Sequence, residues 1–228
     1  SHELRTPLTA IRGYAETLLS GALSDPAAAP KMVDIIHRQS ERLSELVEDL
    51  LELSRLESRE LQLAEKPIDL AQAAQGASEA VRPKARARNT EIELQVAPEL
   101  FVLADPRGVE QVVLNLLDNA VKYTPVNGHV WLRARRMNEH IELTVKDDGP
   151  GIEARHLPRL FERFYRVDKG RSRDMGGTGL GLSIVKHLVT AMKGDVRVES
   201  APGQGSTIFR TLPAPPRVAG NTPASIYD

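Results

Sequence analysis

The sequence predicts an α+β protein in two parts: a two-helix hairpin over residues 1–60, followed by an α/β sandwich over residues 69–212. Two observations predict this class. In the first part, apolar residues recur at alternating spacings of four and three, which is the narrow seam of a coiled coil or helix bundle. In the second part, apolar helical stretches are mixed with segments that alternate at the period of a half-buried strand.

The hairpin repeats one apolar pattern in both of its predicted helices. Residues 21–30 lie between them and are rich in Ala, Pro and Gly, which is typical of a turn. Two helices bury little surface alone, so we expect two chains to pair as a homodimer with a four-helix bundle. The seam consists of Leu4, Leu8, Ile11, Ala15 and Leu18 in the first helix and Ile36, Leu43, Leu46, Leu50 and Leu53 in the second.

The heptad pattern is lost after residue 60. Residues 61–68 contain Pro67 and predict a linker, whereas residues 213–228 carry four prolines and predict a mobile tail. Helices that cover one face of the sheet would make the sandwich. The patterns predict helices over 69–88, 106–122 and 179–193, and strands over 91–96, 101–104, 130–136, 140–147, 195–200 and 206–212.

Composition narrows the classes of function. The 228 residues, 41% of them hydrophobic, suffice for one domain and a smaller element. With 30 basic and 31 acidic residues the chain lacks a basic excess, so we expect no nucleic-acid partner. Cysteine is absent, which excludes disulfides and thiolate chemistry.

We expect this chain to be attached to a membrane only through an upstream segment that is absent from the sequence. No apolar run approaches the ~20 residues that span a bilayer, and no signal peptide is visible. The chain opens inside an amphipathic pattern without an initiating Met. We therefore expect a cytoplasmic piece of a longer protein, with any membrane anchor upstream.

One histidine near the start has a distinctive setting. With Leu4 at the centre of the apolar stripe, His2 and Thr6 each fall about 200° away, on the opposite helix face. Glu3 lies beside that face. A solvent-facing imidazole can act as a nucleophile at neutral pH, and a neighbouring carboxylate can take its proton. A plain surface histidine would fit the same placement.

A polar stripe follows one side of the helix that Asp105 and Pro106 open as N-cap and first helical residue. Asn115, Asn119 and Lys122 lie on this stripe at i, i+4 and i+7. Amide oxygens suit Mg²⁺, and a lysine suits phosphate oxygens. A solvated helix face would give the same pattern, so the stripe alone leaves the two readings open.

Two glycine-rich segments follow. Asp147-Asp148-Gly149-Pro150-Gly151 comes after a predicted strand, where a carboxylate in a pocket could accept the exocyclic amine of adenine. Gly176-Gly177-Thr178-Gly179-Leu180-Gly181 comes before an apolar helix, where backbone N–H groups could hold phosphate. The second segment is neither a Walker A motif nor a Rossmann fingerprint.

Taken in order, these motifs resemble the sensor histidine kinases of two-component systems. The catalytic part resembles the ATPase domain that this family shares with gyrase, the Hsp90 chaperones and MutL. Residues 163–173 and 176–187 look especially like the phosphate-regulon sensor kinases. This likeness implies the cytoplasmic part of an inner-membrane-anchored sensor. The matching blocks are Ser1 to Leu8 (H box), Asn115 to Tyr123 (N box), Asp147 to Gly151 (G1 box), Phe161 to Arg166 (F box) and Gly177 to Gly181 (G2 box), with a further glycine motif at Gly203 to Thr207.

The resemblance implies an ATP-dependent protein-histidine kinase that phosphorylates His2 and passes the phosphoryl group to an aspartate of a response regulator. It implies that Glu3 assists the transfer and that Thr6 supports phosphatase activity. It also implies ATP and Mg²⁺ as cofactors, with Asn119 as the metal ligand and Asn115 assisting. The remaining implied nucleotide contacts are Lys122 and Arg166 at phosphate, Asp147 at adenine, and Tyr123, Gly149, Gly151, Gly177, Thr178, Gly179, Leu180 and Gly181.

Residues 152–178 are long for an ordered connection, so we expect a lid that closes over ATP. His2 belongs to the other part of the chain, so the ATP-binding domain is expected to swing about the linker. Two other classes stay open at this point: a conformational ATPase without phosphohistidine, and a dimerisation scaffold or net phosphatase.

Overall fold

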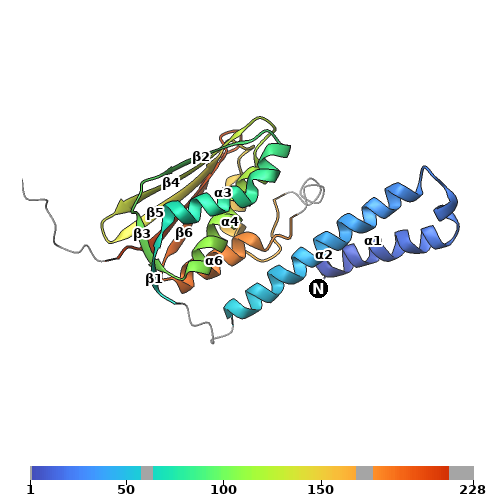
Figure 1. The fold of residues 1–228 in the computed structure, drawn as a ribbon, viewed down its shortest axis with the longest axis horizontal. Helices are drawn as coiled ribbons and strands as arrows, with labels where there is room; N and C mark the ends of the chain where they lie inside the picture. The colour runs from blue at the N-terminus through green and yellow to red at the C-terminus, as the bar shows by residue number, and fades with distance from the viewer. Residues whose placement is uncertain (1, 58–63, 168–176, 216–228) are drawn as a thin grey trace, which may run out of the picture.

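The computed structural model describes residues 2–57, 64–167 and 177–215, with the side chain of His2 outside this description. A helical hairpin lies beside an α/β unit (Figure 1). The hairpin consists of α1 (His2–Leu19) and α2 (Ala29–Glu57), and the short 3-10 helix η1 (Ala22–Ser24) lies in its turn. Both predicted helices of the hairpin are confirmed.

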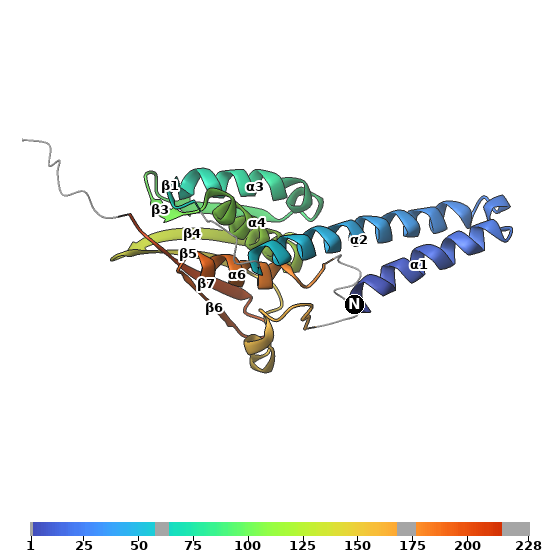
Figure 2. The same cartoon turned by 90° about the horizontal axis from the view of Figure 1, so that it is seen from below.

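The α/β unit is built on a five-stranded sheet with the order β2-β4-β5-β7-β6. The β2–β4 pair is parallel, and the other pairs are antiparallel. Helices α3, α4 and α6 cover one face of the sheet, which can be followed in two views at right angles (Figures 1 and 2). The α+β class and the sandwich are therefore confirmed. The elements are β2 (Glu91–Val96), β4 (His129–Met137), β5 (His140–Asp147), β6 (Asp195–Ser200), β7 (Ser206–Pro213), α3 (Leu70–Ala87), α4 (Pro106–Tyr123), α6 (Gly181–Ala191) and the 3-10 helix η2 (Ala154–Arg159).

A small second sheet differs from the predicted pattern. β1 (Lys66–Asp69) pairs antiparallel with β3 (Phe101–Ala104), although its first residues belong to the segment predicted as a linker. Four residues that begin with Lys and Pro carry no period-two signal, and proline is tolerated in such an edge strand. Residues 61–63 of the predicted linker and 216–228 of the predicted tail lie outside the described residues.

The core lies between the sheet and the helices that cover it. α4 begins where predicted, because Asp105 Oδ1 accepts a hydrogen bond from the Gly108 N–H at 2.9 Å. The predicted apolar face of α4 is buried against the side chains of alternate strand residues. The main contributors are Val109, Val112, Val113, Leu116 and Leu117 of α4, Ile184, Val185 and Leu188 of α6, and Val130, Leu132, Ile141, Leu143 and Leu212 of the sheet.

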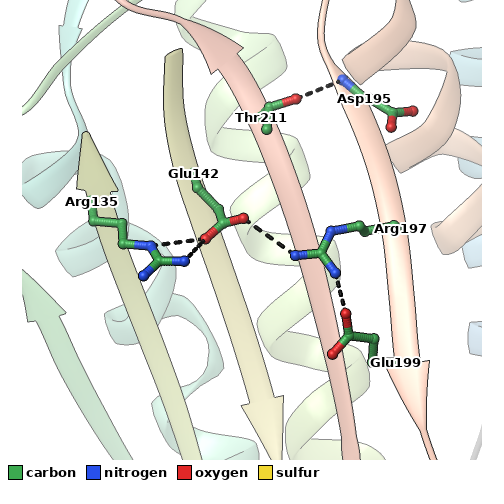
Figure 3. A network of polar contacts seen from close by, with 6 residues as sticks. All are labelled: Arg135, Glu142, Asp195, Arg197, Glu199 and Thr211. Carbon is green, nitrogen blue, oxygen red and sulfur yellow. Dashed lines mark hydrogen bonds and ion pairs between the residues drawn. The ribbon is translucent and has the colours of Figure 1, made fainter. Parts of the chain in front are cut away.

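A polar network lies on the face of the sheet turned away from the helices (Figure 3). Glu142 on β5 accepts hydrogen bonds from Nε and Nη2 of Arg135 on β4, at 2.9 and 2.7 Å. Its other oxygen lies 3.4 Å from Nη2 of Arg197 on β6. The Arg197 guanidinium also lies 3.7 Å from the centroid of the Phe209 ring. These cross-strand contacts compensate the burial of Glu142, whose side chain is 8% exposed.

One arginine of β7 points the other way, into the core. Arg210 pairs across the sheet with Leu143 and Val196 and is 0% exposed. Its three guanidinium nitrogens have no hydrogen-bond partner among the described residues. Burial lowers the pKa of Arg210 to about 9. This charge is an energetic cost to the fold, because nothing in the described core compensates its desolvation.

Across the described ranges, each helix is too short or too polar to cross a membrane.

Candidate functional site

The polar stripe of α4 faces the start of α6. Nδ2 of Asn115 donates to the carbonyl oxygen of Gly181 at 3.5 Å. Nδ2 of Asn119 lies 4.0 Å from the point where a β-carbon on Gly181 would stand. Asn115, Asn119 and Lys122 are all half-buried. The stripe therefore belongs to a wall shared with the second glycine segment and is not an open helix surface.

The amine of Lys122 lies against that glycine segment. A β-carbon on Gly177 would stand 1.9 Å from Lys122 Nζ, so only glycine leaves room for the amine as it is placed. Burial, followed by repulsion from Arg166, lowers the pKa of Lys122 to about 8. The amine also lies 5.5 Å from the centroid of the Tyr123 ring. Two poorly hydrated cations side by side are suited to an anionic ligand such as phosphate.

The segment Phe161 to Arg166 packs on the same glycine segment. The Phe164 N–H donates to the Gly179 carbonyl at 2.9 Å. Gly179 has a φ of +75°, and a β-carbon there would stand 3.0 Å from the Cα of Phe164. Glycine suits this position because it tolerates both the left-handed backbone and the close approach. The contact brings Arg166 near Lys122, and both residues are expected to contact phosphate.

The carboxylate of Asp147 is held in one orientation at the end of β5. Its Oδ1 accepts hydrogen bonds from the N–H groups of Gly149 at 2.9 Å and Ser206 at 3.2 Å. Burial raises the pKa of Asp147, and these two hydrogen bonds oppose the shift. Oδ1 of this half-buried carboxylate is held by two backbone N–H groups. Its second oxygen is therefore suited to accept a hydrogen bond from a donor group of a ligand.

The last glycine motif, Gly203 to Thr207, packs against the turn that follows Asp147. A β-carbon on Gly205, whose φ is +72°, would stand 1.9 Å from the carbonyl oxygen of Asp147. The Gly203 N–H donates to the Pro150 carbonyl at 2.7 Å. A β-carbon on Gly151, in turn, would stand 1.9 Å from the Ala201 carbonyl. The two glycine turns interlock because β5 and β7 are neighbours in the sheet.

The residues of the predicted H box lie on the hairpin, apart from these motifs in the chain. Glu3 and Thr6 are half-buried, and Leu4 packs against the main buried cluster. The His2 imidazole, for which an outward orientation is predicted, lies outside the part of the chain that the structure describes. Residues 168–176 of the expected lid, which include Gly176, also lie outside the described residues.

A residue of α2, which the sequence did not predict to lie at the site, forms a further wall of it. Asp49 on α2 accepts a hydrogen bond from the Thr178 hydroxyl, with 2.5 Å between the oxygens. A signal was present in the chain: Glu45, Asp49 and Glu52 recur at spacings of four and three beside the apolar seam. The stripe did not predict a site, because an acidic stripe on a helix is usually a solvated face.

The fold and the site define an ATPase-type nucleotide-binding sandwich joined to a helical hairpin. Two family descriptions match the chain. The His Kinase A (phospho-acceptor) domain matches residues 1–59, and the Histidine kinase-, DNA gyrase B-, and HSP90-like ATPase matches residues 104–216. The chain belongs to the sensor histidine kinases of two-component systems.

Individual relatives agree with this assignment. The chain is 38% identical over 215 residues to the sensor histidine kinase WalK of Bacillus subtilis, covering 93% of this chain and 35% of the relative. It is 40% identical over 223 residues to the phosphate regulon sensor protein PhoR of Pseudomonas aeruginosa, covering 96% of this chain and 49% of the relative. The structure of the histidine kinase ThkA in complex with the response regulator TrrA matches with a TM-score of 0.76 and 25% identity, over 94% of this chain and 59% of that one. The chain thus spans less than half the length of these two curated relatives.

Proposed function

We propose that this chain is the catalytic core of a sensor histidine kinase, which binds ATP, phosphorylates its own His2 and passes the phosphoryl group to a response regulator. One observation carries the proposal. Lys122 and Arg166 lie together at the second glycine segment, and the turn that anchors Asp147 approaches the backbone of Tyr123, the next residue of α4. The same chain also carries a phospho-acceptor hairpin. Family membership supports the same activity.

The residues present fit a magnesium ion. Asn119 would be the ligand and Asn115 would assist, since both amides lie on the α4 wall beside Gly181. An amide oxygen, water and substrate phosphates form the hard, oxygen-rich set that Mg²⁺ prefers. The bound ion would supply positive charge to the phosphate oxygens.

The transfer needs positioning and charge more than covalent chemistry from the protein. Lys122 and Arg166 would hold the phosphates, and Asp147 would hold the adenine. The imidazole nitrogen of His2 would form a bond to the γ-phosphorus as the bond from that phosphorus to the bridging oxygen of ADP breaks. Glu3 would accept the imidazole proton.

The proposed protein partners are a second copy of this chain and a receiver domain with an acceptor aspartate. Exposed apolar residues on the hairpin support pairing of two hairpins, because an uncovered apolar face favours association. The complex of ThkA with TrrA supports the second partner. The stimulus that the protein senses stays a prediction, because the identity of the chain to WalK (38%) is close to its identity to PhoR (40%). The exposed residues are Leu8, Leu19, Leu23, Val33, Val47 and Leu51.

Labelling with γ-labelled ATP tests the kinase activity. We expect an acid-labile label on the chain that disappears in His2→Gln, although this variant still binds ADP like the wild type. Adding a receiver domain should move the label to that domain. A conformational ATPase would hydrolyse ATP without labelling His2, and a label that persists in His2→Gln would revive that alternative.

Phosphatase activity toward the phosphorylated regulator is a second proposed function. Thr6 lies one turn after His2 on α1, where its hydroxyl could position a water molecule. We expect Thr6→Ala to lose dephosphorylation of the regulator and to keep autophosphorylation. Loss of both activities together would instead point to a structural role of Thr6.

A further inference from the structure

A half-buried histidine lies close to the residue that precedes Arg166, and it has no part in the phosphoryl transfer proposed above. His156 belongs to η2. Its Nδ1 lies 2.6 Å from the hydroxyl oxygen of Tyr165, which is a hydrogen bond. Either group can be the donor, depending on the tautomer of the imidazole ring. The bond therefore closes a loop of chain that ends directly before Arg166.

The ring of Tyr165 is held on a second side by an arginine of the same segment. The guanidinium carbon of Arg159 lies 4.3 Å from the centroid of the tyrosine ring, which is a cation–π distance. The same guanidinium forms an ion pair with Glu162, with Nη2 and Oε2 3.0 Å apart. The Tyr165 N–H donates to the Glu162 carbonyl at 3.2 Å. Both the ring and the backbone of Tyr165 are thus held within this segment.

The start of the segment is anchored to the edge of the sheet. The Ile152 N–H donates to Oγ of Ser200, the last residue of β6, at 2.8 Å. η2 itself lies beside β6, where Figure 2 shows it as a short gold helix. β6 is an edge strand of the five-stranded sheet. His156 therefore belongs to an anchored element, and its hydrogen bond ties Tyr165 to the sheet.

The residue before Tyr165 has an unfavourable backbone conformation. Phe164 has a φ of +60°, in the left-handed region that a bulky residue rarely adopts. Such conformations persist only where the surroundings hold them, and they are concentrated at functional sites. On one side, the Phe164 N–H donates to the Gly179 carbonyl at 2.9 Å. On the other side the chain continues into Tyr165, which His156 holds.

The left-handed residue is followed within two positions by the arginine expected to contact phosphate. A β-carbon on Gly179 would stand 3.4 Å from Cγ of Arg166, so the arginine stem lies over the second glycine segment. Arg166 is also close enough to Lys122 to lower the pKa of that amine. A guanidinium at the end of a long side chain reaches a fixed point only from a fixed backbone. A small displacement of a group that contacts substrate can cost much of its effect.

We propose that His156 is a positioning residue for the phosphoryl transfer. Through its hydrogen bond to Tyr165 it holds Phe164 in the left-handed conformation that keeps Arg166 beside Lys122. His156 acts on the nucleotide only through these residues and has no contact of its own with the reacting atoms. The proposal rests on the proposed function, because it takes Arg166 to contact phosphate.

Calorimetric binding of a non-hydrolysable ATP analogue to the whole chain tests this role. Tyr165→Phe removes only the hydroxyl, and His156→Leu removes the ring nitrogen that bonds to it. We expect the Kd for the analogue to rise about fivefold in each variant, the effect of losing one hydrogen bond. The Kd for adenosine, which lacks phosphate, should stay unchanged. His156→Asn should restore the wild-type Kd, because its amide can place a polar atom where Nδ1 lies.

A double-mutant cycle separates positioning from a general structural role. Arg166→Met should raise the Kd for the analogue, and adding His156→Leu should raise it no further. A histidine that merely stabilised the fold would weaken binding in both backgrounds, so additive losses would overturn the proposal. His140→Leu is the matched control and should bind like the wild type, because His140 is exposed at the opposite end of β5 from Asp147.

The outcomes distinguish this proposal from the proposed function. An unchanged Kd for the analogue in both Tyr165→Phe and His156→Leu would overturn the role of His156 and leave the nucleotide site standing. An equal rise in the Kd for adenosine would overturn that role as well, since the whole site would then be disturbed. If the wild type bound neither the analogue nor ADP, the proposed function would fail, and the role of His156 would fail with it.

Discussion

The side-chain amine of Lys122 lies directly against the backbone of Gly177, where a β-carbon would come within 1.9 Å of the nitrogen. This contact joins the polar stripe of α4 to the segment that precedes α6. It also places a half-buried cation beside backbone that can present N–H groups to phosphate. The cation and the glycine backbone of the candidate site are therefore in contact before any ligand arrives.

The affinity for ADP should fall as the pH rises through about 8, because burial and Arg166 lower the pKa of Lys122 to about 8. Below that pH the amine is already charged. Above it, binding has to take up a proton, so the Kd should rise by up to about tenfold per pH unit. Calorimetry in buffers of different ionisation enthalpy measures this uptake. Lys122→Met should flatten the profile, and a flat profile in the wild type would contradict the prediction.

Asp147→Asn should weaken ADP binding by about 100-fold, or about 2–3 kcal/mol, because it replaces a hydrogen-bond acceptor with a donor. The amide oxygen can still accept the N–H groups of Gly149 and Ser206, so the turn should persist. Calorimetry gives the ADP affinity, and urea unfolding gives the stability. Tripolyphosphate, which lacks adenine, should bind the variant and the wild type alike. Equal losses for both ligands would show that the pocket had collapsed.

Gly205→Ala should destabilise the α/β unit by about 2–4 kcal/mol, because the new β-carbon meets the Asp147 carbonyl oxygen and the backbone φ is +72°. Gly203→Ala is the matched control. Gly203 has a φ of +75° but open space around its β-carbon position, so strain alone should cost about 1 kcal/mol. Chemical denaturation measures both values. Equal costs would mean that the close approach to Asp147 contributes nothing.

Arg210→Met should stabilise the protein by about 1–4 kcal/mol, because a buried charge without a described partner is replaced by an apolar chain of similar length. Arg133→Met on the exposed face of the sheet is the control, and it should change the free energy of unfolding by less than about 0.5 kcal/mol. Urea titrations followed by circular dichroism measure both. Destabilisation by Arg210→Met would reveal a partner that compensates the charge.

Much of the fold could be predicted from local pattern. The strand over 140–147 has the observed bounds because its alternation is set by neighbouring residues alone. The helix opened by Asp105 begins as predicted because its cap bond spans only three residues. By contrast, β1 has too few residues for a period, and its pairing with β3 is decided by a distant part of the chain.

The sequence by itself determined which residue types could form the site, because the amides, cation, carboxylate and glycines lie in short motifs with local geometry. Tertiary structure decided what covers them. Periodicity assigns Leu46 and Leu53 to an apolar face but does not identify its partner, and in this structure that face also meets the α/β unit. The bond between Asp49 and Thr178 joins residues 129 positions apart, and only the packing of the hairpin on the sandwich brings them together.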